Sequence, residues 1–341
     1  MFYDKATLIL KRLLLAIPTL LGVLVISFSL TRALPGDPAV YFAGAMADEA
    51  SIQQVREQLG LDRTLVYQFI TYCQNIAQGE FGQSLSTGQS VSSELGARLP
   101  ASLELTLFGL FLALAISIPL GILSALKPNT WIDHLCRILV TAGASTPIFF
   151  SGLFLMFVFY YLLGWAPSPI GRLDFIFLAP THVTGFYTID ALLEADFETF
   201  YAALSQLILP AVTLALCALA PIARMIRSSM ITALDSEYVK AAKANGISSY
   251  VRIYVYALQN ASLPLLTVIG LVFGFLLGGN VLVEKVYSWP GVGTFAIDAL
   301  IASDYAAIQG FVLIMAVLFV SLNLFIDILY TLFDPRMGRN E

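Results

Sequence analysis

The chain has 341 residues, of which 58% are hydrophobic and only 12% are charged. A soluble domain carries about 25% charged residues, so this chain has too few charges to cover its surface in water. Its abundant apolar residues also exclude intrinsic disorder. The composition therefore predicts an integral membrane protein.

Six stretches are long and apolar enough to span a bilayer, which requires about 20 residues with few charges. In chain order they are residues 13–31, 105–126, 138–171, 199–223, 253–283 and 305–326. We read the first as an uncleaved span, because its apolar run is too long for a signal peptide. Pro147 lies within the third, where neighbouring helices can satisfy the freed backbone carbonyl. The prediction is an all-α polytopic membrane protein with six transmembrane helices.

The segment between the first two spans, about 69 residues from Arg32 to Pro100, is too long for a simple connector. Apolar residues recur at helical spacing within residues 52–59 and again within 65–72. Two short amphipathic helices should therefore form a small external cap, which either contacts a partner or only covers the spans. We divide the chain into residues 1–32, 33–100 and 101–341.

The placement of Lys and Arg gives the orientation, because loops on the cytoplasmic side are enriched in them. With six spans, 12 of the 18 basic residues fall on the side that carries both termini. Most acidic residues fall on the other side. We therefore expect both termini to be cytoplasmic, and the net charge of −5 to be a difference between two oppositely charged faces.

The sequence lacks the residue patterns that are typical of several enzyme classes. No lysine follows a glycine, so the chain has no phosphate-binding P-loop. Neither histidine is followed by glutamate, and the three cysteines are widely scattered. We expect no catalytic residue, no metal site and no nucleic-acid partner.

The loop between the fourth and fifth spans, residues 224–262, carries the most informative pattern. Asp235 or Ser236 can cap the start of a short helix, and Gly246 can end it in the left-handed conformation. Four residues share one smooth face at helical spacing: Tyr238, Ala241, Ala242 and Asn245. Such a helix fits a groove on a cytoplasmic partner, or lies at the membrane surface as an ordinary loop helix.

Residues 237–246 read Glu-Tyr-Val-x-Ala-Ala-x-Ala-x-Gly, which resembles the EAA loop of permease subunits of ABC importers. In that family the loop forms a coupling helix that docks in a cleft of the ATP-hydrolysing subunit. The resemblance implies this coupling role for five residues: Glu237, Tyr238, Ala241, Ala242 and Gly246.

Two further segments resemble signatures of the first (B-type) subunit of the dipeptide/oligopeptide/nickel permease family. Their residues are Pro35, Gly36, Asp37 and Pro38, and then Trp289, Pro290, Gly291 and Gly293. Shorter matching segments lie at residues 59–62, 81–84, 184–186, 208–210 and 304–305. From turn chemistry alone, the second segment either gates the external mouth or only shapes it, and Trp289 could equally be an interfacial anchor.

The resemblance implies the type I ABC importer permease fold in the bacterial cytoplasmic (inner) membrane. The chain would form, with a second homologous permease, the pathway for di- and oligopeptides delivered by an extracytoplasmic binding protein. Two ABC ATPase subunits would carry ATP and magnesium, so this chain would hold no cofactor and would not be an enzyme. The alternatives are a similar permease for nickel-chelate, glutathione or another small solute, and a stand-alone secondary transporter.

Polar residues inside the spans are candidates for lining a pathway. Asp327 lies one turn after Asn323 on one face, and it either lines the pathway or pairs with a basic residue at the cytoplasmic edge. Asn280 and Glu284 either face a polar cavity or form interhelical hydrogen bonds. Glu104 lies near the external boundary, and we expect it to remain hydrated.

Overall fold

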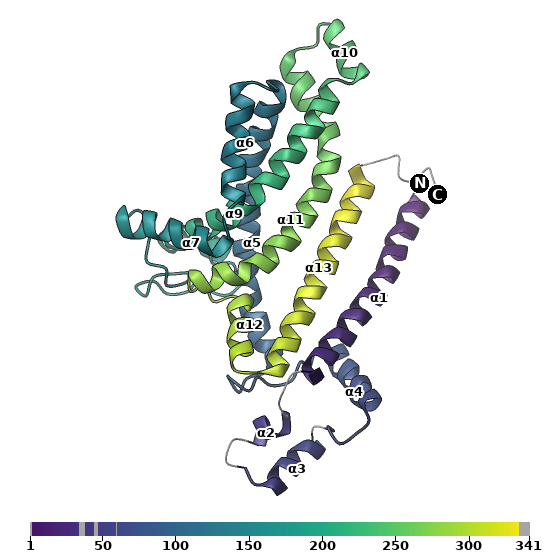
Figure 1. Ribbon diagram of the computed structural model, residues 1–341, viewed down its shortest axis with the longest axis vertical. Coiled ribbons are helices and arrows are strands. Elements are labelled where there is room, and N and C mark those ends of the chain that lie inside the picture. Colours follow the sequence, from purple (N-terminus) through teal and green to yellow (C-terminus); the bar gives the residue numbers. More distant parts are fainter. Residues whose placement is uncertain (1, 34–37, 44–46, 59, 334–341) are drawn as a thin grey trace. The chain divides into compact units, whose positions relative to one another are not determined.

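The computed structural model describes residues 2–33, 38–43, 47–58 and 60–333 (Figure 1). Within these residues every regular element is helical, and strand pairing is limited to an isolated bridge between Gln83 and Ser90. The predicted all-α class is confirmed.

The described helices range from six residues (Pro38–Ala43) to 38 residues (Phe197–Leu234). In chain order the helices are α1 (Phe2–Ala33), α2 (Pro38–Ala43), α3 (Glu49–Gln58), α4 (Leu65–Ala77), α5 (Val91–Leu126), α6 (Trp131–Ala144), α7 (Ile148–Leu155), α8 (Tyr187–Leu193), α9 (Phe197–Leu234), α10 (Glu237–Ala244), α11 (Leu258–Val286), α12 (Val292–Ile301) and α13 (Tyr305–Phe333). Two π-helical segments, Met156–Leu162 and Val251–Ala257, follow α7 and precede α11.

Within the described residues, four helices are long and apolar enough to cross a membrane: α5, α9, α11 with its π-helical start, and α13. A bent pair, α6 with α7, passes the same test when it is taken as one span. In α1, residues Leu14–Ser29 form a shorter apolar stretch that coincides with the predicted first span. Each of the six predicted spans therefore coincides with helical structure.

The third span differs from its prediction. The sequence predicts one span and a following turn within residues 138–171. The structure has two helical segments instead: α6 and α7, which continues into the π-helical segment Met156–Leu162, meet at 99° across a short break. Pro147 lies at this break in an extended conformation (φ −56°, ψ 136°) and precedes the first residue of α7. Proline has no N–H and disfavours helix in the residue before it, so the chain turns here.

The chain groups into two compact units, the first of which contains Pro100–Gly291. In this unit α9 is central, because it contacts α6, α7, α8 and α11. Three glycines allow neighbouring helices to approach α9 closely: Gly109 and Gly121 on α5, and Gly143 on α6. A Cβ at Gly121 would lie 2.7 Å from the Ile226 side chain, so only glycine fits there without movement.

The second unit contains Ala6–Leu99 together with Val292–Ser321. Its core joins Val91 and Leu95 of α5 to Phe295 of α12. The buried Asp304 accepts hydrogen bonds from Ser84 Oγ (2.6 Å) and from the backbone and side chain of Ser86 (both 3.1 Å). Two of the short matching segments, residues 81–84 and 304–305, thus meet although they lie far apart in the sequence.

The two predicted cap helices correspond to α3 and α4 in the second unit. The aromatic rings of Phe69 and Tyr72 on α4 pack against Phe28 of α1, with centroids 5.3 and 5.8 Å away. The Tyr72 hydroxyl also donates to Ser27 Oγ at 3.4 Å. These contacts attach the cap to the end of the first predicted span.

Candidate functional site

The short helix predicted between the fourth and fifth spans is present as α10, and the predicted glycine ends it. Ser236 is the extended residue before the helix, but its hydroxyl donates back to the Ala233 carbonyl instead of capping α10. At the other end, Gly246 has φ +74°, as its position after the last turn predicts. Its N–H donates to Lys243 O, and Ile247 N–H donates to Ala242 O, both at 3.1 Å. This pair of bonds is a Schellman motif, which requires the left-handed residue.

The two faces of α10 differ from the predicted grouping. Val239 and Ala242 are 3% and 6% exposed, so they pack into the chain. Tyr238 is 44% exposed, and Ala241 and Asn245 are also exposed. The expectation that Ala242 shares the open face is therefore wrong. We define the exposed face of α10 by its four members: Glu237, Tyr238, Ala241 and Asn245.

A small charge cluster lies at the start of α10. Lys240 Nζ is 3.1 Å from Asp235 Oδ1 and 3.3 Å from Glu237 Oε1. The hydrogen bond to Asp235, followed by that to Glu237, raises the pKa of Lys240 above its ordinary value. Because these groups are exposed, the pairs contribute little to stability and leave the charges available to a partner.

The Trp289 signature segment forms a buried turn. Trp289 is 1% exposed, and its Nε1 donates to the Ala101 carbonyl at 2.9 Å. Ser288 adopts φ +53°, and Gly291 lies against the Glu284 carboxylate so closely that a Cβ would overlap it. The interpretation of Trp289 as an interfacial anchor is wrong, because its ring is enclosed by the chain itself.

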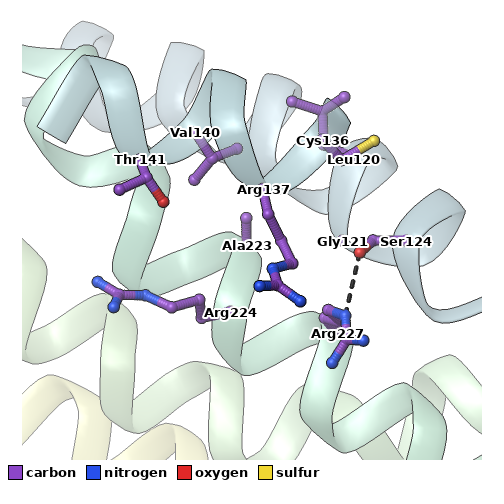
Figure 2. Close-up of a pocket in the computed structure, with 10 residues that line it drawn as sticks. All are labelled: Leu120, Gly121, Ser124, Cys136, Arg137, Val140, Thr141, Ala223, Arg224 and Arg227. Atoms are coloured by element: carbon purple, nitrogen blue, oxygen red, sulfur yellow. Dashed lines mark hydrogen bonds between the residues drawn. The ribbon is translucent and has the colours of Figure 1, made fainter. Parts of the chain in front are cut away.

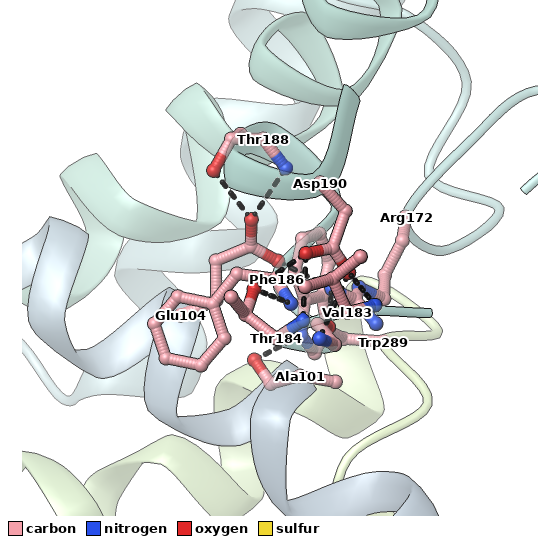
Figure 3. A network of polar contacts seen from close by, with 10 residues as sticks. Ala101, Glu104, Arg172, Val183, Thr184, Phe186, Thr188, Asp190 and Trp289 are labelled. Atoms are coloured by element: carbon pink, nitrogen blue, oxygen red, sulfur yellow. Dashed lines mark hydrogen bonds and ion pairs between the residues drawn. The ribbon is translucent and has the colours of Figure 1, made fainter. Parts of the chain in front are cut away.

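A buried ion pair lies beside this turn (Figure 3). Arg172 Nη2 is 2.6 Å from Glu104 Oε2 and 2.7 Å from the Gly185 carbonyl. The second Glu104 oxygen accepts from Thr188 N (2.9 Å) and Thr188 Oγ1 (2.6 Å). The Arg172 guanidinium also lies 3.5 Å from the centroid of the Tyr187 ring. Glu104 is only 4% exposed, so the expectation that it remains hydrated is wrong.

Asp190 organises the adjacent loop. Its carboxylate accepts from Thr184 N (2.8 Å), Thr184 Oγ1 (2.6 Å) and Gly185 N (2.8 Å). Burial opposes ionisation, but these hydrogen bonds outweigh it and hold the pKa of Asp190 below its ordinary value of 3.8. The matching segment at residues 184–186 is therefore shaped by one buried carboxylate.

Asn280 is enclosed within the first unit. It is 2% exposed, and its side-chain amide donates to Ser102 O at 3.1 Å and to Thr106 Oγ1 at 3.0 Å. Glu284 is also buried and accepts from Ser102 Oγ. Of the two interpretations, interhelical hydrogen bonding is confirmed for both residues. Asn280 and Glu284 thus link α11 to α5, and the Asn280 side chain is almost fully enclosed by this chain.

Comparison with known proteins gives the family. Residues 117–339 match the family described as "Binding-protein-dependent transport system inner membrane component", and residues 6–106 match the N-terminal part described for the same kind of membrane component. The chain belongs to this family of ABC transport permeases. It is a multi-pass membrane protein with the permease fold, as the sequence resemblance implied.

Relatives of this permease match it over nearly their whole length. A probable D,D-dipeptide transport system permease protein of Escherichia coli (strain K12) is 46% identical over 93% of each chain. A di/tripeptide transport system permease protein of Pseudomonas aeruginosa is 42% identical over 96% of this chain and 97% of its own. A glutathione transport system permease protein of Shigella flexneri is 37% identical over 96% and 98%.

The remaining predicted residues of the permease fall in several places. Pro35, Gly36 and Asp37 lie outside the described residues, and Pro38 is the first residue of α2. Gly293 is buried in α12. Asn323 is exposed and Asp327 half-buried on α13, and their role in a pathway stays a prediction.

Arg172 is the residue that sequence reasoning missed. Its partner Glu104 lies 68 positions earlier, and no local sequence pattern predicts a pair at that separation. The sequence does offer one signal: Arg172 is one of the few basic residues on the predicted external side, and Glu104 is an acid at the external end of a predicted span.

Proposed function

We propose that this permease is a transmembrane subunit of an ATP-driven importer that takes up di- and oligopeptides. The observation that carries the proposal is the near full-length similarity to permeases named for dipeptide and di/tripeptide transport, at 46% and 42% identity. An extracytoplasmic binding protein delivers the peptide, and a second, homologous permease completes the pathway. The complex resides in the bacterial inner membrane, with both termini of this chain in the cytoplasm.

Coupling to ATP is proposed to pass through α10. Two ABC ATPase subunits hold ATP and magnesium, so this chain needs no cofactor and performs no covalent chemistry. The exposed face of α10 docks on one ATPase subunit. On the adjoining face of the helix, Val239 and Ala242 are packed into the chain, where α10 contacts α9 and the π-helical start of α11.

This arrangement supports a mechanical role for α10. The helix has eight residues, so it is about 12 Å long and too short to bend appreciably. Because both of its ends lead into spans, a displacement of α10 by ATPase closure tilts α9 and α11. In this alternating-access cycle, ATPase closure opens the cavity outward, and hydrolysis resets it inward.

The substrate assignment is tested by transport in reconstituted vesicles. The complete complex, with both permeases and both ATPases, is placed in liposomes that contain ATP, and the binding protein and a labelled dipeptide are added outside. We expect ATP-dependent uptake of the dipeptide. Uptake of glutathione or of a nickel chelate in place of the dipeptide would contradict the peptide assignment and support the corresponding alternative.

A further inference from the structure

A cavity of about 380 Å³ lies between α5, α6 and α9, near the end of α9 that leads into α10 (Figure 2). Gly121 and Ser124 of α5 and Val140 of α6 form part of its wall. Three arginines also line it: Arg137 of α6, and Arg224 and Arg227 of α9. None of these three residues belongs to the coupling helix or to the ion pair near Trp289.

The positive charge of this cavity is only partly balanced. Asp133, which is fully buried, accepts from Arg227 Nε at 2.8 Å and from Arg227 Nη2 at 2.7 Å. The Arg227 charge is therefore neutralised by a bidentate pair. Among the described residues no carboxylate lies within ion-pair distance of Arg137 or Arg224. Two guanidinium charges thus remain to attract an anion.

The surroundings of the cavity are those of a membrane interface. Leu135, Ile138 and Leu139 of α6 are 46%, 64% and 55% exposed, and each is next in sequence to a residue that lines the cavity, so the helix that forms one wall also carries an exposed apolar surface. Trp131, the first residue of α6, is 72% exposed, and tryptophan is enriched at the depth of lipid headgroups. A ligand that fits both features carries an anionic group next to apolar chains.

We propose that this cavity binds the headgroup phosphate of an anionic phospholipid in the leaflet on the α10 side. Arg137 and Arg224 contact the phosphate, and the acyl chains lie along the exposed leucine and isoleucine side chains of α6. Basic pockets between transmembrane helices on the cytoplasmic side favour such headgroups. The bidentate Arg227–Asp133 pair holds α6 and α9 together and so fixes the shape of the site.

The test uses the complete purified transporter and measures retained lipid by native mass spectrometry. After delipidation, phosphatidylglycerol or phosphatidylcholine is added back to the wild type and to the double variant Arg137→Gln/Arg224→Gln. Each basic residue near an anionic headgroup strengthens binding by roughly the same amount, so the double variant should retain phosphatidylglycerol on the order of 30-fold more weakly. Phosphatidylcholine should bind weakly to both proteins.

Three controls make the result decisive. Arg252→Gln removes a basic residue on the same side but outside the cavity, and it should retain phosphatidylglycerol like the wild type. Arg137→Lys/Arg224→Lys keeps both charges and should restore most of the binding. Inorganic phosphate alone should not displace the lipid. The proposal would be overturned if the wild type and the glutamine variant retained phosphatidylglycerol equally, or if the wild type bound phosphatidylcholine as well as phosphatidylglycerol. If free phosphate displaced the lipid, the cavity would be a site for inorganic phosphate and not for a phospholipid headgroup.

Discussion

At the scale of single residues, the permease buries an ion pair near its predicted external side. Arg172 Nη2 donates to Glu104 and to the Gly185 carbonyl, and Thr188 donates to the second Glu104 oxygen, while the buried Arg172 Nε has no hydrogen-bond partner. Such a pair adds little net stability compared with apolar residues, but breaking it leaves one buried charge without its partner. The pair therefore fixes the geometry of the loop that carries residues 184–190.

Removing one partner of this ion pair should cost far more than the intact pair contributes, and this difference predicts the outcome of a double-mutant cycle. Glu104→Gln alone should lower the free energy of unfolding by about 3–5 kcal/mol, because the Arg172 charge stays buried. Arg172→Met alone should cost a similar amount. The double variant should be more stable than the sum of the two single losses predicts, as measured by thermal unfolding of the purified complex. Additive losses would show that the two side chains do not interact.

Asp190 predicts a specific pH dependence. Because its pKa in the folded protein lies below 3.8, the ionised carboxylate contributes stability that is complete above that value. The contribution is lost as the pH falls through the lower, folded-state pKa. The melting temperature of the wild type should therefore fall more steeply below about pH 4 than that of Asp190→Asn, which lacks the titrating group. Parallel curves for the two proteins would contradict this assignment.

At the scale of elements, α10 depends on how its last turn ends. Gly246 has φ +74°, and a Cβ there would meet nothing within 4 Å. A substitution at this position therefore strains the backbone without creating a clash.

Gly246→Val should cost about 1–2 kcal/mol in the left-handed conformation and shift the end of α10. We expect slower peptide uptake and weaker retention of the ATPase subunits on purification. Gly246→Asn is the matched control, since asparagine tolerates positive φ, and it should behave almost as the wild type. Equal losses of uptake and ATPase retention in both variants would show that the added side chain, and not backbone strain at positive φ, causes the defect.

Some of the helices could be predicted from the sequence, and other features of the fold could not. The positions of α5, α9, α11 and α13 follow from long charge-free runs, which only helices can satisfy within a bilayer. The break between α6 and α7 was missed because hydropathy continues through Pro147, and a proline inside a span does not by itself reveal a 99° bend. The buried side of α10 was assigned wrongly, because Ala241 and Ala242 are both small and helical spacing does not tell which of them faces the chain.

At the scale of the whole molecule, the proposed orientation places α10 in the cytoplasm and the segment between α12 and α13 outside. Ala244 of α10 and Ala302 after α12 are both exposed, so a cysteine at either position can be reached by a reagent. This pair gives a direct test of the orientation that the basic residues predict.

In a variant without the natural Cys73, Cys136 and Cys217, single cysteines are introduced as Ala244→Cys or Ala302→Cys. A maleimide that cannot cross membranes should label Ala302→Cys in intact right-side-out vesicles. It should label Ala244→Cys only after the vesicles are permeabilised. The reverse pattern would contradict the proposed orientation.

The central claim is that the exposed face of α10 transmits ATPase movement to the spans, and Ala241→Arg tests it most directly. Ala241 is exposed, so arginine there should leave the amount of permease in the membrane unchanged. The matched control is Ala302→Arg, which places the same side chain on an exposed site far from α10 in the sequence. The measurement is the amount of ATPase subunit that copurifies with the permease, together with peptide uptake in the same cells. We expect Ala241→Arg to lose both copurification and uptake, and Ala302→Arg to retain the ATPase. Normal copurification with normal uptake in Ala241→Arg would contradict the coupling role of α10.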